Sequence, residues 1–383
     1  MAHLSFRRTA TMLALVLPCA VAHAQRASYV TTLGTDTLAF EQFERMGDSI
    51  VGDWVTTYGG IGVHHYTIHL RPDGTVARYA LSIHRLTGRV DGTTDLRFVG
   101  DSLIARGFDS TEQHLPLGNA VPTAAQTIAA LNLVIAQASA TRQASARVPV
   151  VSAFGPYRRG EMLVAFFGRD SVRLGDPRSP IWVTLDRDGR IMALSDRATC
   201  TREETRRVPN YDWHAIIKHF PDIPDTAALV GVPAISPRDT ARATLGDAAI
   251  TIDYGRPAVR GRDVFRNGVL GDTLWRVGAN APTQFVTTRD LIVGSETLPA
   301  GRYVLWVRAA PDNSNYTLLF NAQTGQAVVP MPPPQTTVAA QLTRRAASSP
   351  VERLTIRVAP GGAENELRIE WGMTALGAPI RLK

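Results

Sequence analysis

Four arginines and an asparagine gather in one part of the chain, where their side chains could bind an anion. Residues 250–265 have the sequence ITIDYGRPAVRGRDVF, and residues 274–280 have the sequence LWRVGAN. A guanidinium group presents a fixed fork of donors that matches carboxylate, phosphate or sulfate, and an asparagine adds both a donor and an acceptor. The two segments therefore predict a site for an anionic or carbohydrate ligand, and its candidate residues are Arg256, Arg260, Arg262, Arg276 and Asn280.

The same arginines are equally suited to bracing the fold, and we favour this interpretation. Arg256 and Arg276 have three aspartates near them in sequence, which are Asp253, Asp263 and Asp272. Ion pairs with these acids would tie the loop to a sheet. Trp275 would then be buried beside the loop.

The residues that usually carry catalysis are absent from this region. No histidine or cysteine occurs after residue 235, which removes the usual general base, thiol nucleophile and soft metal ligand. Nucleophile triads, a phosphate-binding glycine loop and a dinucleotide fingerprint are also missing from the sequence. Asp253, Asp263 and Asp272 remain as carboxylates for a hydrolase, an alternative that we keep. The sequence favours binding over catalysis and predicts no catalytic residue and no cofactor.

Histidines in the first half of the chain invite a metal-site interpretation. His65 and His69 share one face of a predicted strand, but four residues separate them by roughly 13 Å, whereas zinc bonds are about 2 Å long. A turn at residues 71–74 would place His84 opposite residues 62–63, where only His64 is near it. The pattern therefore predicts no metal site.

The first 24 residues have the features of a bacterial signal peptide. Arg7 and Arg8 precede a short apolar run, and Ala22-His23-Ala24 is a small-x-small cleavage pattern. We expect the mature protein to be exported to the periplasm or beyond the cell. Removal of residue 19 with the leader leaves Cys200 as the one cysteine, so no intramolecular disulfide is expected.

Charge and hydropathy do not indicate a nucleic-acid or membrane partner. The chain carries 41 basic and 34 acidic residues, a net charge of +7, and the leader contributes two of the arginines. The surplus is spread along the sequence without a long basic run. No stretch after the leader approaches the roughly 20 apolar residues of a transmembrane helix.

Prolines near residues 208–236 divide the chain into two predicted domains. Residues 25–207 form the first, residues 208–234 form a linker, and residues 235–383 form the second. Within the linker, residues 211–220 predict a short helix. We expect this helix to pack Trp213, Ile216, Ile217 and Phe220 on one domain.

The first domain is predicted to be an antiparallel β meander with one buried helix. Residues 65–70 and 76–83 alternate in polarity around the turn Arg71-Pro-Asp-Gly74, and similar turns occur near residues 100, 168 and 188. Residues 122–138 predict the helix, with Pro122 in its first turn. A curved sheet around a buried helix resembles the half-barrel carriers of the bacterial periplasm, and this likeness is architectural only. An apolar-ligand or lipid carrier is therefore the first alternative, and a helix that serves only as core is the simpler one.

The second domain is predicted to be a β-sandwich. Short strands separated by Gly-, Pro- and Asp-rich turns are typical of that fold. Residues 331–334, with three prolines in a row, are expected in an exposed edge or loop. The predicted strands are residues 241–245, 249–254, 283–288, 302–308, 316–321, 351–358 and 367–371.

Residues 235–383 resemble the bacterial secreted family called domain of unknown function 2911, whereas the N-terminal part resembles no family. The segments that carry the resemblance are Ser236-Pro-Arg238, residues 250–265, residues 274–280 and Leu298-Pro-Ala-Gly-Arg-Tyr303. The resemblance implies an all-β domain attached to export signals, and it implies no activity. Where the family usually has an acid after Asn280, this chain has Ala281-Pro282. It also lacks the family's aromatic segment after Asn321.

Together these features predict an exported two-domain β protein that binds a small or extended ligand, or an envelope partner, without chemistry of its own.

Overall fold

The computed structural model describes residues 25–56, 62–85, 90–124, 127–175, 177, 180–196, 203–217, 236–265, 269, 274–279, 281–322, 338–361 and 364–383. Most of these residues lie in strands, which form two large sheets, and two helices accompany the first sheet. The chain is therefore mainly β, as predicted. The predicted signal peptide and Cys200 lie outside the described residues. None of the described helices has the length and apolar character needed to cross a bilayer.

The first sheet contains fifteen strands. The first nine are β1 (Gln25–Leu33), β2 (Asp36–Met46), β3 (Ser49–Thr56), β4 (Gly62–Leu70), β5 (Val76–Arg85), β6 (Val90–Val99), β7 (Ser102–Arg106), β8 (Glu112–Leu115) and β9 (Val121–Thr123). The other six are β10 (Ser145–Ser152), β11 (Arg159–Phe167), β12 (Ser171–Leu174), β13 (Ile181–Leu185), β14 (Ile191–Asp196) and β15 (Glu204–Val208).

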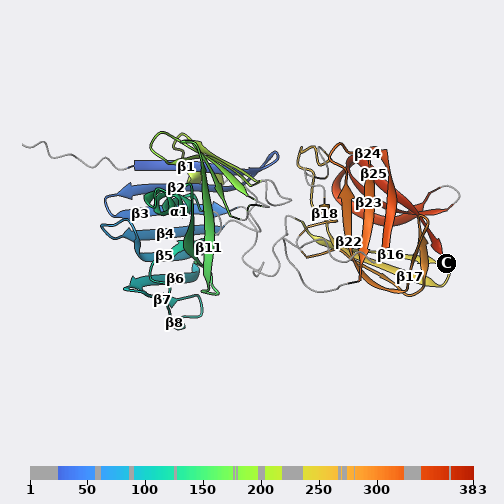
Figure 1. The fold of residues 1–383 in the computed structure, drawn as a ribbon, viewed down its shortest axis with the longest axis horizontal. Coiled ribbons are helices and arrows are strands. Elements are labelled where there is room, and N and C mark those ends of the chain that lie inside the picture. The colour runs from blue at the N-terminus through green and yellow to red at the C-terminus, as the bar shows by residue number, and fades with distance from the viewer. Residues whose placement is uncertain are drawn as a thin grey trace, which may run out of the picture.

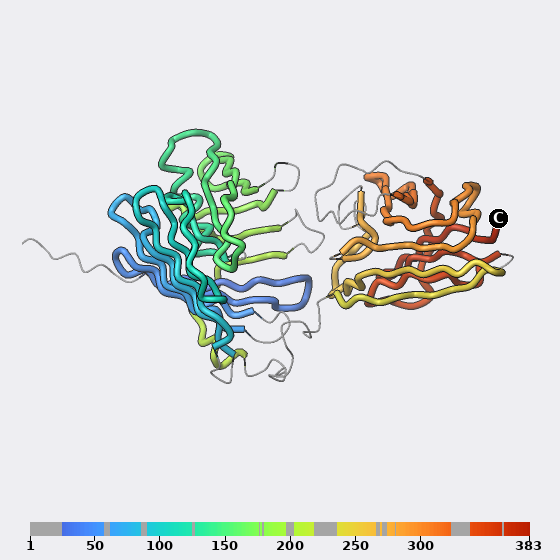
Figure 2. Tube along the Cα trace, turned by 90° about the horizontal axis from the view of Figure 1, so that it is seen from below, coloured from blue at the N-terminus to red at the C-terminus, as the bar shows by residue number. Residues whose placement is uncertain are grey.

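Two meanders join at one pair of strands to make this sheet. The order is β8-β7-β6-β5-β4-β3-β2-β1-β15-β14-β13-β12-β11-β10-β9, and the pairing of β1 with β15 joins the meanders. Figure 2 shows them as two wings of one strongly curved sheet. The predicted antiparallel meander is confirmed, and its curvature leaves a concave face for a helix.

The predicted hairpin between β4 and β5 is also confirmed. Gly74 N donates to Arg71 O (2.9 Å), and Gly74 has the positive φ of 83° that the turn requires. His84 lies opposite Val63, within the pair of positions predicted from the turn. The alternation of apolar and polar residues around a Pro-Asp-Gly turn was therefore enough to predict the register of this hairpin.

The buried helix α1 (Ile128–Ala140) starts later than predicted. Residues 121–123 form β9 instead, and Pro122 lies at this edge strand, where a missing N–H breaks no ladder. The helix begins where the carboxylate of Glu41 on β2 accepts the N–H groups of Ile128 (2.5 Å) and Ala129 (3.0 Å). A partner distant in sequence therefore sets the start of α1.

Helix α1 lies on the concave face of the first sheet, as Figure 1 shows. Its buried residues are Ile128, Ala129, Ala130, Leu131, Leu133, Val134, Ile135 and Ala138. They share one apolar core with side chains from both meanders, among them Tyr66, Leu96 and Val164. Most of the surface of α1 is therefore buried in this core.

The short helix α2 (Trp213–Ile217) covers part of the other face. Trp213 and Ile217 are buried in a small cluster with Phe40 and Val55, and Ile216 packs against it. The predicted docking of this helix on the first sheet is confirmed for these residues, whereas Phe220 lies outside the described residues.

The second sheet contains the remaining strands. They are β16 (Arg238–Leu245), β17 (Ala248–Gly255), β18 (Leu274–Arg276), β19 (Gln284–Thr287), β20 (Leu291–Val293), β21 (Glu296–Leu298), β22 (Gly301–Ala309), β23 (Tyr316–Asn321), β24 (Val338–Pro360) and β25 (Asn365–Leu382). The order is β16-β17-β19-β22-β23-β24-β25-β20-β21, and β18 pairs with β22.

This sheet folds over to form the predicted sandwich. The start of β24 pairs with β23 in one layer, and the rest of it pairs with β25 in the other. Figure 2 shows the two layers face to face. Their side chains form one core, in which the rings of Trp275 and Trp371 stack with centroids 5.7 Å apart. The predicted proline-rich segment, residues 331–334, lies outside the described residues.

Candidate functional site

Arg256 braces the sandwich. Its Nε donates to Leu354 O (3.0 Å) and its Nη2 to Thr355 Oγ1 (3.1 Å), so it ties the end of β17 to β24. Its Nη1 pairs with Asp239 Oδ2 (3.0 Å) on β16. The acid is therefore Asp239 rather than one of the three predicted aspartates, because Asp253 is bound by Arg238 at 2.9 Å. The bracing interpretation of Arg256 fits this geometry.

Arg260 and Gly261 are the central residues of a tight turn from Val259 to Arg262. Arg262 N donates to Val259 O (3.0 Å), and both central residues have positive φ, 51° and 70°. Positive φ at both positions is the requirement of a type I′ turn, and it is unusual for an arginine. The turn is fastened to β24 because Val259 N donates to Glu352 O (2.8 Å) and Arg260 N to Glu352 Oε1 (2.9 Å).

This turn also contacts the first sheet, at the hairpin between β1 and β2. Thr35 N donates to Arg260 O (3.0 Å), and the Arg260 guanidinium forms an ion pair with Asp36. Figure 2 shows the hairpin reaching toward the second sheet. A Cβ added at Gly34 would lie 2.0 Å from Arg260 O, so only glycine allows this approach. Arg260 therefore links the two sheets.

The other predicted residues do not converge on one point. Arg262 directs its Nε to Val259 O (2.9 Å) and its Nη2 to Ala258 O (2.6 Å), so it closes its own loop. Arg276 lies on β18 opposite Trp306, and its buried Nε has no hydrogen-bond partner within the described parts of the chain. Asn280 lies outside the described residues. Of the four candidates that the structure describes, only Arg262 lines the pocket next to this loop, which is described below.

Gly255 and Gly278 hold together residues 250–265 and 274–280, the two segments that we call the signature. A Cβ added at Gly255 would lie 2.2 Å from Ala279 O, and one added at Gly278 would lie 2.8 Å from Thr283 Oγ1. The end of β17 and the turn after β18 therefore pack backbone against backbone. This contact brings the two segments of the signature together.

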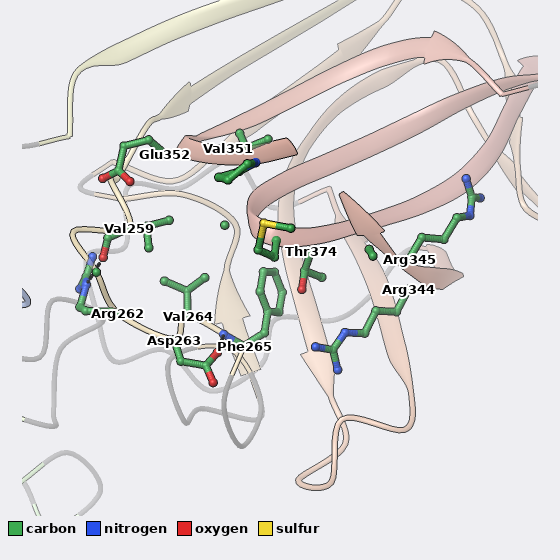
Figure 3. A pocket seen from close by; sticks show the side chains of 15 residues that line it. Val259, Arg262, Asp263, Val264, Phe265, Arg344, Arg345, Val351, Glu352 and Thr374 are labelled. Carbon is green, nitrogen blue, oxygen red and sulfur yellow. Dashed lines mark hydrogen bonds between the residues drawn. The ribbon is translucent and has the colours of Figure 1, made fainter. Parts of the chain in front are cut away.

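A pocket of about 720 Å³ opens beside the Val259–Arg262 turn, between that loop and the bend of β24 and β25. Figure 3 shows the side chains that surround it. Its apolar lining consists of Val259, Val264, Phe265, Ala346, Pro350, Val351 and Met373. Its charged lining consists of Arg262, Arg344, Arg345, Asp263 and Glu352. The pocket is therefore amphipathic.

Arg344 is the cation of this pocket with the fewest ties to the protein. Its guanidinium carbon lies 6.0 Å from the ring centroid of Phe265 and 5.9 Å from that of Tyr316, and it has no carboxylate partner within the described parts of the chain. Figure 3 shows its side chain extending along the pocket toward Phe265. Sequence reasoning missed Arg344, because a pair of exposed arginines in a strand carries no motif. A cation–π contact positions the Arg344 guanidinium and leaves its N–H groups available for hydrogen bonds.

The other charged groups of the pocket are already engaged. Arg345 pairs with Glu366, a carboxylate that also accepts from Arg368 Nε (2.8 Å). Burial raises the pKa of Glu366, but the hydrogen bonds from Arg368 and Arg345 outweigh burial and leave it below its ordinary value. Glu352 binds Arg260 N, and Asp263 Oδ1 accepts from Phe265 N (3.3 Å). Arg344 is thus the group with donors to offer a ligand.

Ala281 and Pro282, at the position where the family that the sequence resembles usually has an acid, lie beside Arg238. The carbonyl oxygens of Ala281 (3.1 Å) and Pro282 (3.4 Å) accept from Arg238, which also binds Asp253. Backbone oxygens therefore hold this arginine. The region of the missing aromatic segment, residues 323–337, lies outside the described residues.

Glu41 in the first sheet is a second group that sequence reasoning missed. It is fully enclosed, and it accepts from Tyr66 Oη (2.8 Å) as well as from the first turn of α1. Burial raises its pKa to about 7, although the three donors oppose this rise. The side chain of the N-cap residue Thr127 makes no cap bond, so Glu41 takes that role. Glu41 therefore caps the start of α1.

The histidines of the first sheet have separate environments. His64 is buried between Trp54 and Phe154, and burial, with a smaller effect from Arg85, lowers its pKa to about 4. His65 pairs with Asp53 (2.8 Å) and His69 with Ser49 (3.0 Å). Within the described ranges no group of three or more His, Cys, Asp or Glu side chains is placed to hold a metal ion.

Comparison with known proteins finds one family model, which matches the second sheet. Residues 236–380 match the family model described as "Protein of unknown function (DUF2911)", and the N-terminal part matches no family model. This confirms the resemblance found in the sequence. No curated protein matches the chain.

Two solved structures have a partial likeness to the chain. A DUF1089 family protein from Pseudomonas aeruginosa is 11% identical, with a TM-score of 0.33 over 41% of this chain and 89% of that one. A β-barrel-like protein of domain of unknown function DUF1849 from Brucella abortus is 14% identical, with a TM-score of 0.35 over 49% of this chain and 98% of that one. At these scores neither carries an argument about function.

Proposed function

We propose that this chain is an exported β protein whose second sheet binds a small organic anion and does not transform it. The observation that carries the proposal is Arg344, which lines a pocket of about 720 Å³ and whose guanidinium carbon lies 6.0 and 5.9 Å from two aromatic ring centroids. The volume lies within the roughly 300–1,000 Å³ usual for small-molecule sites.

The lining of the pocket defines the ligand. One end offers the donors of Arg344, which match a carboxylate, phosphate or sulfate. The walls offer Val259, Phe265, Val351 and Met373, which suit an apolar or ring-shaped body. The ligand class is therefore an anion with a hydrophobic or sugar body. The predicted Arg262 contributes by shaping the loop, since its guanidinium binds the carbonyls of Val259 and Ala258.

A binding role fits the chemistry of the pocket better than a hydrolase does. Of the three carboxylates considered for hydrolysis, Asp263 lines the pocket, Asp253 pairs with Arg238, and Asp272 lies outside the described residues. The pocket also contains no histidine and no cysteine among its lining residues. Export to the periplasm or beyond the cell rests on the sequence of residues 1–24 and is tested by N-terminal sequencing of the secreted protein.

A thermal-shift screen tests the binding proposal. The panel is phenyl phosphate, benzoate, glucuronate and inorganic phosphate, with neutral benzyl alcohol and glucose as references. We expect at least one organic anion to raise the melting temperature more than inorganic phosphate and the neutral compounds do. The shift should disappear in Arg344→Ala and persist in Arg242→Ala, an exposed arginine on β16 away from the pocket. Equal shifts in the two variants would overturn the proposal.

A further inference from the structure

A second cavity, of about 280 Å³, lies in the first sheet between α1 and strands β1 to β3. Its walls are formed by Tyr29, Phe43, Ile50, Ala129, Asn132, Leu133 and Ala136. Its other lining residues are Gln25, Arg26, Ala27, Arg45, Asp188, Gly189, Arg190 and Arg207. Apolar walls therefore adjoin a rim that is rich in arginine.

One face of α1 explains why space remains here. Ala129, Asn132, Leu133 and Ala136 recur at intervals of three and four, so they project from one side of the helix. Two of these four side chains are a single methyl group, which leaves room between helix and sheet. The facing wall is the concave side of β1 to β3, where Arg45 lies opposite Ile50.

Two polar atoms of the wall, Tyr29 Oη and Asn132 Oδ1, are already bonded within the protein. Tyr29 Oη donates to Ile191 O (2.7 Å), and Asn132 Oδ1 accepts from Ile191 N (3.0 Å). The rings of Tyr29 and Phe43 stack with centroids 6.0 Å apart. An acyl chain in this space would therefore displace no hydrogen bond of the protein and would bury its own apolar surface.

The rim of the cavity carries a positive surplus. Arg207 Nη1 lies 3.3 Å from Asp186 Oδ2, and Arg190 Nη1 lies 3.8 Å from Asp188 Oδ2. Arg45 directs its Nε to the main-chain oxygen of Gly47 (3.3 Å) and is exposed. A hydrogen bond to a main-chain oxygen does not neutralise the guanidinium, so Arg45 adds a positive charge to the rim. The rim is complementary to an anionic head group.

We propose that this cavity binds the acyl chain of a single-chain carboxylate, with the carboxylate at the arginine rim. Its volume is below the roughly 300–1,000 Å³ of sites for drug-sized ligands. The cavity therefore suits a single acyl chain better than a lipid with two chains. The site is separate from the pocket of the second sheet, because the two share no lining residue. It also differs in ligand, since it selects chain length as well as charge.

Calorimetric titration of the whole protein with decanoate tests this proposal, at concentrations below micelle formation. Decyltrimethylammonium has the same chain with the opposite charge, and butyrate has the same head group with a short chain. We expect saturable binding of one decanoate per protein and binding at least about tenfold weaker for the other two compounds. Ala136→Trp, which fills the mouth of the cavity, should abolish binding, and Arg45→Ala should weaken it about threefold to tenfold.

Matched variants keep the experiment decisive. Arg147→Ala on β10 and Arg242→Ala on β16, which change exposed arginines outside the cavity lining, should bind decanoate as the wild type does. Circular dichroism confirms that every variant is folded. The proposal is overturned if decanoate does not bind, if decyltrimethylammonium binds equally well, or if Ala136→Trp leaves the affinity unchanged.

Discussion

The arginines of residues 256–262 direct most of their donors to the protein itself. Arg256 binds β24, Arg260 binds the β1–β2 hairpin, and Arg262 binds carbonyls of its own loop. Composition and spacing predicted a cluster of guanidinium groups that could bind one ligand. They could not predict the partners, because the acceptors are main-chain oxygens and acids as far away as Asp36. Arg344, whose guanidinium has no carboxylate partner within the described parts of the chain, lies in a segment without a recognisable motif.

Gly255 offers a test of the signature as a packing device. Gly255→Ala would place a Cβ 2.2 Å from Ala279 O, and backbone cannot move aside as a flexible side chain can. We expect a loss of about 1–3 kcal/mol in the free energy of unfolding, measured in urea. Gly301→Ala is the matched control, because its nearest neighbour would be Tyr303 Oη at 3.4 Å. Similar stabilities for the two variants would contradict this account of the signature.

Among the elements, the strands were the most predictable and α1 the least. Each of the seven strands predicted from the alternation of apolar and polar residues overlaps a strand of the second sheet, namely β16, β17, β19, β22, β23, β24 or β25. The short β18, β20 and β21 were missed because three residues are too few for a period. The start of α1 was wrong because Glu41, which caps it, is 87 residues away from Ile128.

The attachment of α1 by Glu41 predicts a pH dependence. Its pKa of about 7 in the fold exceeds the ordinary value of 4.5, so the folded state holds the proton more tightly than the unfolded state. The stability from this group is therefore fully present below about pH 4.5 and is lost as pH rises through about 7. The difference amounts to about 3 kcal/mol.

Urea unfolding of the wild type and of Glu41→Gln between pH 5 and pH 8 measures this effect. The wild type should lose stability relative to the variant as pH rises, because the glutamine does not titrate. Both proteins retain His64, so their difference isolates Glu41. Parallel stability curves would contradict the assignment.

At the scale of the whole molecule, the two sheets meet where the turn between β1 and β2 contacts the Arg260 turn. The sequence did not predict this contact, because a Gly-Thr-Asp turn is an ordinary hairpin. Gly34→Ala would bring a Cβ 2.0 Å from Arg260 O and should separate the turns. Small-angle scattering should then show a larger radius of gyration than the wild type has.

Gly47→Ala is the control for that experiment. Gly47 has nearly the same φ, 61° against 60°, but an added Cβ would meet no atom within 4 Å. The control therefore carries the same backbone strain without the clash. If both variants scatter as the wild type does, Gly34 is not what holds the turns together.

The most direct test of the proposed function is a calorimetric titration with the strongest organic anion of the panel. Arg344→Ala should weaken binding about tenfold or more, because a charge-assisted hydrogen bond contributes about 1.5–3 kcal/mol. Arg242→Ala should keep the wild-type dissociation constant. An Arg344→Ala protein that binds the anion as tightly as the wild type would show that the pocket beside the Val259–Arg262 turn is not the binding site.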